Sequence, residues 1–279
     1  MPRALSEIEA DSTEIDDDVA FGAYAPRGVQ AGMIGLARNS FLGRGKARHL
    51  MTRLIMSLGG PLDIRYRDCN YRIEGRNNSV EYGLLLKPKF NGPEIDFLVE
   101  GLPEGGKAVD VGCNIGAYSL PLARAVGEAG RVLSIDANGA MTARLRYNAR
   151  ISGLANITTV GAAVGDQEGS VDLRISKDDV AIVKAQSTPD GAVPQRTLAA
   201  LVHEAGFDRV DVLKIDIEGF EDKALVPYLD GASPELLPAR IVIERPDRNG
   251  DYPGCAAAFA RHGYRLIDRT RSNSLYLKA

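Results

Sequence analysis

The chain has 279 residues, of which 44% are hydrophobic and 25% charged, as in an ordinary soluble globular protein. No apolar run reaches the roughly 18–20 residues of a membrane-spanning helix, and the acidic N-terminus lacks the apolar core of a signal peptide. The three cysteines, Cys69, Cys113 and Cys255, lie far apart, which predicts free thiols and a cytoplasmic location. The formal net charge of -3 argues against nucleic acid as a partner.

Charge is unevenly distributed over residues 1–95, for which we expect an N-terminal extension and an α+β cap region. Residues 7–18 carry seven acids, so we expect residues 1–20 to be disordered. Residues 19–62 carry six bases and no acid. Two interpretations of the basic stretch 27–58 stay open: an amphipathic helix that packs on the protein, or a segment that contacts a membrane surface.

The apolar spacing within this region predicts a few short elements. Leu50, Met51, Leu54, Ile55 and Leu58 recur at helical spacing, which predicts a helix over 48–58. We expect short strands at 63–68, 71–75 and 81–87, and a short helix at 92–102.

Residues 96–279 alternate between short apolar strands and helices. The strands expected are 107–112, 131–136, 156–164, 210–216, 239–244, 264–268 and 274–278, with an edge strand or hairpin at 170–176. The helices expected are 119–130, 139–153, 197–206, 220–229 and 255–263. Such alternation predicts an α/β fold in which helices cover both faces of a mostly parallel, seven-stranded sheet. Only five residues separate the last two strands, so we expect them to form an antiparallel hairpin.

The turn after the first of these strands carries Asp110, Gly112, Asn114 and Gly116. Counted from Gly112, the dinucleotide fingerprint would need glycine where Asn114 and Ala117 stand, so it fails. The phosphate loop of nucleotide hydrolases also fails, because no Gly-Lys-Ser/Thr follows. A nicotinamide-dependent oxidoreductase is therefore disfavoured.

An acid stands at each end of this region. Asp110 precedes the turn and could hold an amino group, and Asp136 ends the second strand, where an acid suits a ribose diol. A nucleoside that carries an amino acid fits both, and S-adenosylmethionine (SAM) is such a molecule. The alternative is that Asp136 only caps the helix that follows.

The stretches VDVGCNIGAYS, LSIDAN, LKIDIEGFE and IVIER, within about residues 90–245, resemble the FkbM family of SAM-dependent methyltransferases. The resemblance implies a class I methyltransferase (Rossmann-like) fold with strand order 3-2-1-4-5-7-6. It also implies methyl transfer, usually to a hydroxyl oxygen, with a saccharide, glycolipid or secondary metabolite as the acceptor.

The resemblance further implies roles for individual residues. The methionine half of SAM would contact Asp110, Gly112, Asn114 and Gly116, and the ribose would contact Asp136. The residues that would border the adenine are Ala162, Ala163 and Asp166. Two small residues, Cys113 and Ala137, stand where the family often has alanine and proline. Tyr118 either packs near SAM or belongs to the core.

Lys214, Asp216 and Glu218 are spaced two apart, so in an extended strand they share one face. Charges on a buried strand are costly unless they are paired or used in chemistry. Asp216 is the first candidate for a base that accepts the proton of a hydroxyl, and Glu218 is the second. Lys214 would pair with Asp216, and Glu244 would face the same cleft.

Other interpretations of these acids stay open. Asp216, Glu218 and Glu244 could bind a divalent metal ion, or they could be a structural ion pair and a helix cap. Arg269 and Arg271 could reach an anionic acceptor, or they could lie on a solvated hairpin. A non-catalytic SAM-binding protein is a further alternative, although it would be expected to lack the acids of the KIDIEG stretch. The oligomeric state cannot be inferred from the sequence.

Overall fold

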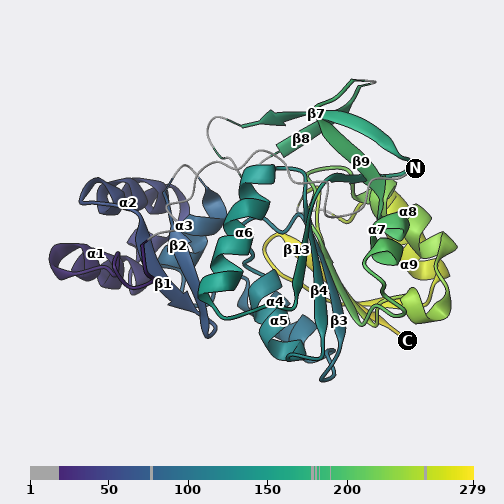
Figure 1. Ribbon diagram of the computed structural model, residues 1–279, viewed down its shortest axis with the longest axis horizontal. Coiled ribbons are helices and arrows are strands. Elements are labelled where there is room, and N and C mark those ends of the chain that lie inside the picture. Colours follow the sequence, from purple (N-terminus) through teal and green to yellow (C-terminus); the bar gives the residue numbers. More distant parts are fainter. Residues whose placement is uncertain are drawn as a thin grey trace.

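The computed structural model describes residues 19–75, 78–176, 179, 181, 183–188, 190–247 and 250–279. We expected residues 1–20 to be disordered; of these, residues 1–18 lie outside the described residues. A seven-stranded sheet runs through the molecule (Figure 1). In spatial order its strands are β12 (Tyr264–Arg269), β13 (Asn273–Lys278), β11 (Arg240–Glu244), β10 (Val212–Ile215), β3 (Lys107–Val111), β4 (Arg131–Asp136) and β5 (Ile157–Gly161).

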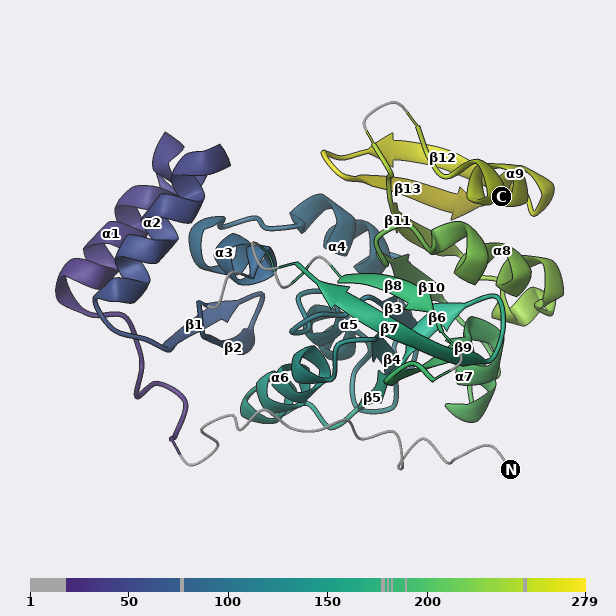
Figure 2. The ribbon, with the colours of Figure 1, turned by 90° about the horizontal axis from the view of Figure 1, so that it is seen from above.

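The connectivity of this sheet confirms the predicted fold class. Strand β13 is antiparallel to both of its neighbours, and the other neighbouring pairs are parallel. The terminal hairpin forms one edge of the sheet and β5 forms the other (Figure 2). Numbered within the sheet along the chain, the order from β5 is 3-2-1-4-5-7-6.

Helices cover both faces of the sheet, and each face has its own apolar cluster. The helices on one face are α4 (Gly92–Val99), α5 (Ser119–Val126) and α6 (Gly139–Ile151); those on the other are α7 (Leu198–Glu204), α8 (Glu221–Gly231) and α9 (Pro253–Arg261). Alternation along β3 sends Ala108 to the first cluster and Val109 and Val111 to the second. The same alternation places Asp110 and Lys214 on the face that α4 to α6 cover.

A second sheet lies above the carboxyl edge of the first (Figure 1). Its strands, in spatial order, are β6 (Ala163–Gly165), β9 (Val193–Thr197), β7 (Gly169–Ile175) and β8 (Val183–Ser187). The expected single strand 156–164 is wrong, because the chain leaves the main sheet at Ala162, whose N–H donates to the Asp136 carbonyl. The hairpin expected around 170–176 is confirmed as β7 paired antiparallel with β8.

The cap region contains α1 (Gly28–Arg38), α2 (Gly45–Ser57), β1 (Leu62–Tyr66), β2 (Cys69–Ile73) and α3 (Ser79–Leu86), together with a short 3-10 turn, Phe41–Gly43. The predicted helix over 48–58 and the first two strands are confirmed. The strand predicted at 81–87 is wrong, because these residues belong to α3. The Asn78 side chain accepts N–H groups of Val80 and Glu81 and so begins this helix.

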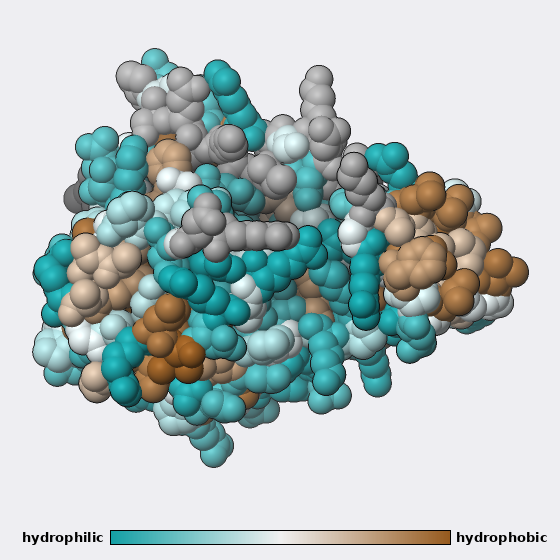
Figure 3. All heavy atoms as spheres, turned by 180° about the vertical axis from the view of Figure 1, so that it is seen from behind, coloured by the Kyte–Doolittle hydropathy of each residue, from teal (hydrophilic) through white to brown (hydrophobic). Residues whose placement is uncertain are grey.

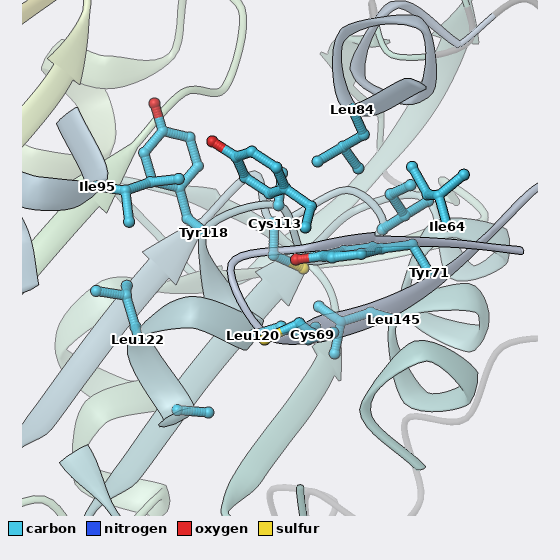
Figure 4. Packing of buried hydrophobic residues seen from close by; sticks show 14 of the residues in the cluster. Ile64, Cys69, Tyr71, Leu84, Ile95, Cys113, Tyr118, Leu120, Leu122 and Leu145 are labelled. Atoms are coloured by element: carbon cyan, nitrogen blue, oxygen red, sulfur yellow. The ribbon is translucent and has the colours of Figure 1, made fainter. Parts of the chain in front are cut away.

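The cap and the sheet share one hydrophobic cluster (Figure 4). Tyr71 of β2 packs among Leu120, Leu145 and Cys69, and its hydroxyl donates to the Gly116 carbonyl at 3.2 Å. Arg144 of α6 forms a buried ion pair with Glu81 of α3. The cap therefore reaches the turn after β3 and is packed as part of the same core.

The outer face of α1 and α2 exposes apolar side chains. Figure 3 shows this as a brown area at the end of the molecule that these helices form. The exposed apolar residues of this end are Val29, Leu36, Phe41, Leu50, Leu54 and Leu58, whereas Ile55 is buried. The membrane contact of residues 27–58 stays a prediction. Within the described residues, no helix is long and apolar enough to cross a bilayer.

Candidate active site

A cavity of about 560 Å³ opens at the carboxyl ends of β3, β4, β10 and β11. It brings together most of the residues singled out in the sequence: Gly112, Cys113, Asn114, Tyr118, Asp136, Ala137, Ala162, Ala163, Lys214, Asp216, Glu218 and Glu244. Three of the expected cofactor-binding residues do not line it. Asp110 is fully buried beneath the turn, Gly116 contacts Tyr71 of the cap, and Asp166 is exposed.

The turn after β3 packs directly against the end of β10. Gly112 has φ +76°, and a Cβ atom there would lie 1.8 Å from the Asp216 carbonyl oxygen. The N–H groups of Gly112 and Cys113 both donate to the Ile135 carbonyl, at 2.8 and 3.0 Å. Position 112 therefore requires glycine for two reasons: the backbone of Asp216 lies too close for a side chain, and φ is positive.

A buried charged pair lies beneath this turn. Lys214 and Asp110 are register partners on β10 and β3, with 3.5 Å between Nζ and Oδ1. Lys214 also donates to the Gly112 carbonyl at 2.7 Å, whereas the Asp216 carboxylate is 3.9 Å away. The nearer ionic partner of Lys214 is therefore Asp110. Burial lowers the pKa of Lys214, but the carboxylates of Asp110 and Asp216 outweigh it and leave the pKa above its ordinary value.

Asp136 joins the end of β4 to the turn. Its two carboxylate oxygens accept the N–H groups of Asn114 and Asn138, each at 2.8 Å. The helix cap is Asn138, whose side chain accepts from Ala140 N–H. Burial raises the pKa of Asp136 to about 6, against the opposing effect of its backbone hydrogen bonds. Asp136 therefore organises the cavity wall and does not itself cap α6.

Three carboxyl groups converge on the opposite side of the turn. Asp216, Glu218 and Glu244 each offer an oxygen, and these oxygens lie within 4.8 Å of one another. Burial, followed by the charge of Asp216 and a hydrogen bond to it, raises the pKa of Glu244 far above its ordinary value. Glu244 is therefore a neutral acid beside Asp216 at neutral pH. The same three groups are the candidates for a metal site.

Glu221 is an organising residue that the sequence analysis did not single out. Strand β10 ends at Ile215, and Glu218 adopts a left-handed conformation with φ +55°. The buried Glu221 carboxylate accepts the N–H groups of Ile217 and Gly219, at 2.8 and 2.9 Å. The available signal was an acid at the start of the helix predicted over 220–229, two residues after Gly219.

The cap and the terminal hairpin form the other wall of the cavity, which the sequence analysis mostly missed. Its residues include Arg48, Lys87, Phe90, Glu94, Thr270, Arg271 and Asn273. Of the two arginines considered for the hairpin, Arg271 lines the cavity. Arg269 instead pairs with Asp251 at 2.9 Å.

The strand order, with a glycine turn at the end of its first strand, defines the class I methyltransferase (Rossmann-like) fold. Residues 110–266, more than half of the chain, match the family model described as the FkbM methyltransferase domain. The chain belongs to this family.

Relatives of known name match the chain less extensively. A 23S rRNA (uracil(1939)-C(5))-methyltransferase RlmD from Psychrobacter arcticus is 44% identical over 55 residues, which are 20% of this chain and 11% of that protein. The matched stretch is thus about a tenth of the relative's length.

Two solved structures are also similar. A SAM-dependent O-methyltransferase from Thermotoga maritima has 18% identity and a TM-score of 0.40, covering 67% of this chain and 65% of that one. The M. jannaschii TYW2 in complex with AdoMet has 13% identity and a TM-score of 0.41, covering 79% and 89%. At such scores, the class of fold rests on the strand order of this chain itself.

The close approach at Gly112 gives the first testable prediction. In Gly112→Ala the new Cβ would overlap the Asp216 carbonyl, so we expect the free energy of unfolding to fall by about 3 kcal/mol or more. Gly153→Ala is the matched control, since Gly153 also has positive φ (+68°) but nothing within 4 Å of a Cβ. It should cost about 1 kcal/mol. Urea unfolding followed by circular dichroism measures both, and equal losses would contradict the contact.

The raised pKa of Glu244 predicts a pH dependence of stability. The folded protein holds this proton more tightly than the unfolded chain, so the stabilisation is full below the ordinary carboxyl pKa and is lost as pH rises toward the folded value. Between about pH 6.5 and 8.5, above the pKa of Asp136, wild type should therefore lose stability and Glu244→Gln should lose less.

Urea midpoints at several pH values in this window test the expectation. Glu235→Gln is the control, because Glu235 is exposed, has a lowered pKa and should leave the slope unchanged. If Glu244→Gln and wild type have the same slope, Glu244 does not hold a proton in this window.

Proposed function

We propose that this protein is a SAM-dependent methyltransferase that methylates a hydroxyl oxygen of a saccharide, glycolipid or secondary metabolite. The observation that carries the proposal is that one cavity joins the Gly112 turn and Asp136 to the carboxyl groups of Asp216 and Glu244. A cofactor site and a proton acceptor thereby face the same space. Membership of the family supports methyl transfer, and the choice of oxygen rests on the carboxyl cluster.

The chemistry of the residues that line the first part of the cavity supports a SAM site there. Asp136 stands at the end of β4, where a carboxylate can accept from a ribose diol. Ala137, Ala162 and Ala163 have small side chains that leave room for a flat base. The backbone from Gly112 to Asn114 lines the place for the methionine half. Asp110 and Gly116 would act indirectly, through Lys214 and Tyr71, because neither lines the cavity.

The protein's own part in the reaction is to orient the acceptor, exclude water and take up a proton. SAM supplies the methyl group and its leaving group. Asp216 would accept the proton of the acceptor hydroxyl, and Glu218 is the alternative base. Glu244, whose pKa is raised by burial and by the charge of Asp216, would share a hydrogen bond with Asp216. Lys214 Nζ lies 3.9 Å from the Asp216 carboxylate, where its positive charge faces the same group.

Two other functions are compatible with residues of this site. A divalent ion bound to Asp216, Glu218 and Glu244 would acidify the hydroxyl directly, and a chelator would then abolish activity. A non-catalytic SAM-binding protein would bind the cofactor and transfer nothing. RNA, the acceptor that the name of RlmD indicates for that protein, is disfavoured here by the net charge of -3.

Calorimetric titration with S-adenosylhomocysteine tests the cofactor assignment. Wild type should bind, and Asp136→Ala should bind at least about tenfold more weakly, because it loses charge-assisted hydrogen bonds to the ribose. Asp166→Ala is the matched control, since Asp166 is exposed and outside the cavity lining. Thermal melts of each variant separate loss of binding from loss of folding.

The titration of wild type is repeated in the presence of a chelator. Three results are informative. If wild type binds with and without chelator and Asp136→Ala does not bind, the result supports a SAM site that needs no metal. Equal affinity in wild type and Asp136→Ala would contradict the role of Asp136. No binding by wild type would reject the proposed cofactor.

A further inference from the structure

Four basic side chains line the wall of the cavity that the cap and hairpin form, and one of them, Lys89, is exposed and lies two residues after Lys87. The other three come from distant parts of the chain. Arg48 comes from α2, Lys87 follows α3, and Arg271 lies in the turn between β12 and β13. More than 180 residues of sequence separate Lys87 from Arg271.

These cations lack ionic partners in the described part of the chain. None of the three has an ion pair there, and the buried Nε of Arg48 has no hydrogen-bond partner. The two acids whose charges act on them, Asp179 and Glu94, accept hydrogen bonds from uncharged groups. Asp179 accepts the N–H groups of Ser79 and Ala181, and Glu94 accepts from Thr270 and Asn273.

The three cations line the same cavity and act on one another electrostatically. Burial lowers the pKa of Lys87, and the charges of Arg48 and Arg271 lower it further, against Glu94. Burial likewise lowers the pKa of Arg48; Asp179 opposes this effect and Arg271 adds to it. Like charges held together in a partly buried site cost free energy, and a bound anion would relieve that cost.

We propose that Arg48, Lys87 and Arg271 bind an oxyanion of the acceptor, so that the substrate is a small molecule carrying a phosphate or carboxylate group beside the hydroxyl that is methylated. This inference rests on the proposed function and names the acceptor class of that site. The guanidinium groups match the planar, two-oxygen geometry of such anions.

Electrostatics would also orient this acceptor. The carboxyl groups of Asp216 and Glu218 line the same cavity and would repel the anionic group. The anion would therefore bind at the wall formed by the cap and hairpin, where Arg48, Lys87 and Arg271 outnumber the acid Glu94. The hydroxyl would then face Asp216. A neutral acceptor would gain nothing from this separation of charge.

Two other sources of an anion must be distinguished. One is the carboxylate of SAM itself, in which case these cations would determine cofactor affinity. The other is an RNA backbone, which is disfavoured by the small volume of the cavity, about 560 Å³, and by the negative net charge of the protein. Each of these two sources predicts a different result from an anionic acceptor when anions or RNA are added to protein already saturated with S-adenosylhomocysteine.

The experiment is calorimetric titration of the S-adenosylhomocysteine-saturated protein with inorganic pyrophosphate, with citrate and with a short RNA oligonucleotide. Wild type should bind pyrophosphate, citrate or both, and the preferred one identifies the class of anion. Arg48→Met, Lys87→Met and Arg271→Met should each weaken that binding about tenfold, through loss of a charge-assisted contact. Their affinity for S-adenosylhomocysteine should be unchanged.

Arg53→Met and Arg265→Met are matched controls. Arg53 is exposed on the same helix as Arg48, Arg265 is exposed on the same hairpin as Arg271, and neither lines the cavity. Both variants should bind the anion as wild type does. Arg271 is exposed, so Arg271→Met keeps the test usable if Arg48→Met disturbs folding.

The failures are separable. If wild type binds S-adenosylhomocysteine but neither anion, the anionic-acceptor inference is rejected and the proposed function stands. If the three variants lose affinity for S-adenosylhomocysteine, the cations serve the cofactor and the inference is again rejected. Tighter binding of RNA than of either small anion would reject a small-molecule acceptor. If wild type does not bind S-adenosylhomocysteine, the proposed function itself fails.

Discussion

The buried ion pair between Lys214 and Asp110 is the interaction on which the site depends. Both side chains are almost completely inaccessible, so each charge would be costly without the other. The Asp110 carboxylate also accepts from Ser119, which in turn accepts from Ser134, so a polar row crosses β10, β3 and β4 beneath the turn. Lys214 connects this row to the turn itself through the Gly112 carbonyl. The ends of three strands are thereby fixed relative to one another.

The cap holds the other side of the turn that follows β3. Tyr71 holds the Gly116 carbonyl, and Asn78 donates to the Asn114 side chain at 2.9 Å, so the far side of the turn is held by residues outside the seven-stranded sheet. The cap also supplies Arg48 and Lys87 to the cavity. The cap and the terminal hairpin thus form one wall of the cavity, and we propose that this wall binds the acceptor. Substrate choice is therefore expected to depend on these two parts of the chain.

The sequence predicts the central sheet well because its strands are short, apolar and separated by helices with clear periodicity. It also predicts the contributors to the cavity from the glycine turn and the KIDIEG stretch, since these motifs are local in sequence. It fails at α3, where residues 81–86 are all buried and give no helical period, and at β9, whose residues are largely polar. Arg48 and Lys87 escape prediction because they are far from Arg271 in sequence, and only the folded chain brings the three to the lining of one cavity.

A double-mutant cycle on Lys214 and Asp110 would measure how strongly the two buried charges depend on each other. The free energy of unfolding would be measured by urea titration for Lys214→Met, Asp110→Asn and the double variant. Lys214→Met strands a buried carboxylate and should cost about 3–5 kcal/mol. The double variant should be destabilised by clearly less than the sum of the two single losses, with a coupling of more than about 1 kcal/mol. Additive losses would show that the two charges do not depend on each other and would contradict this account of the site.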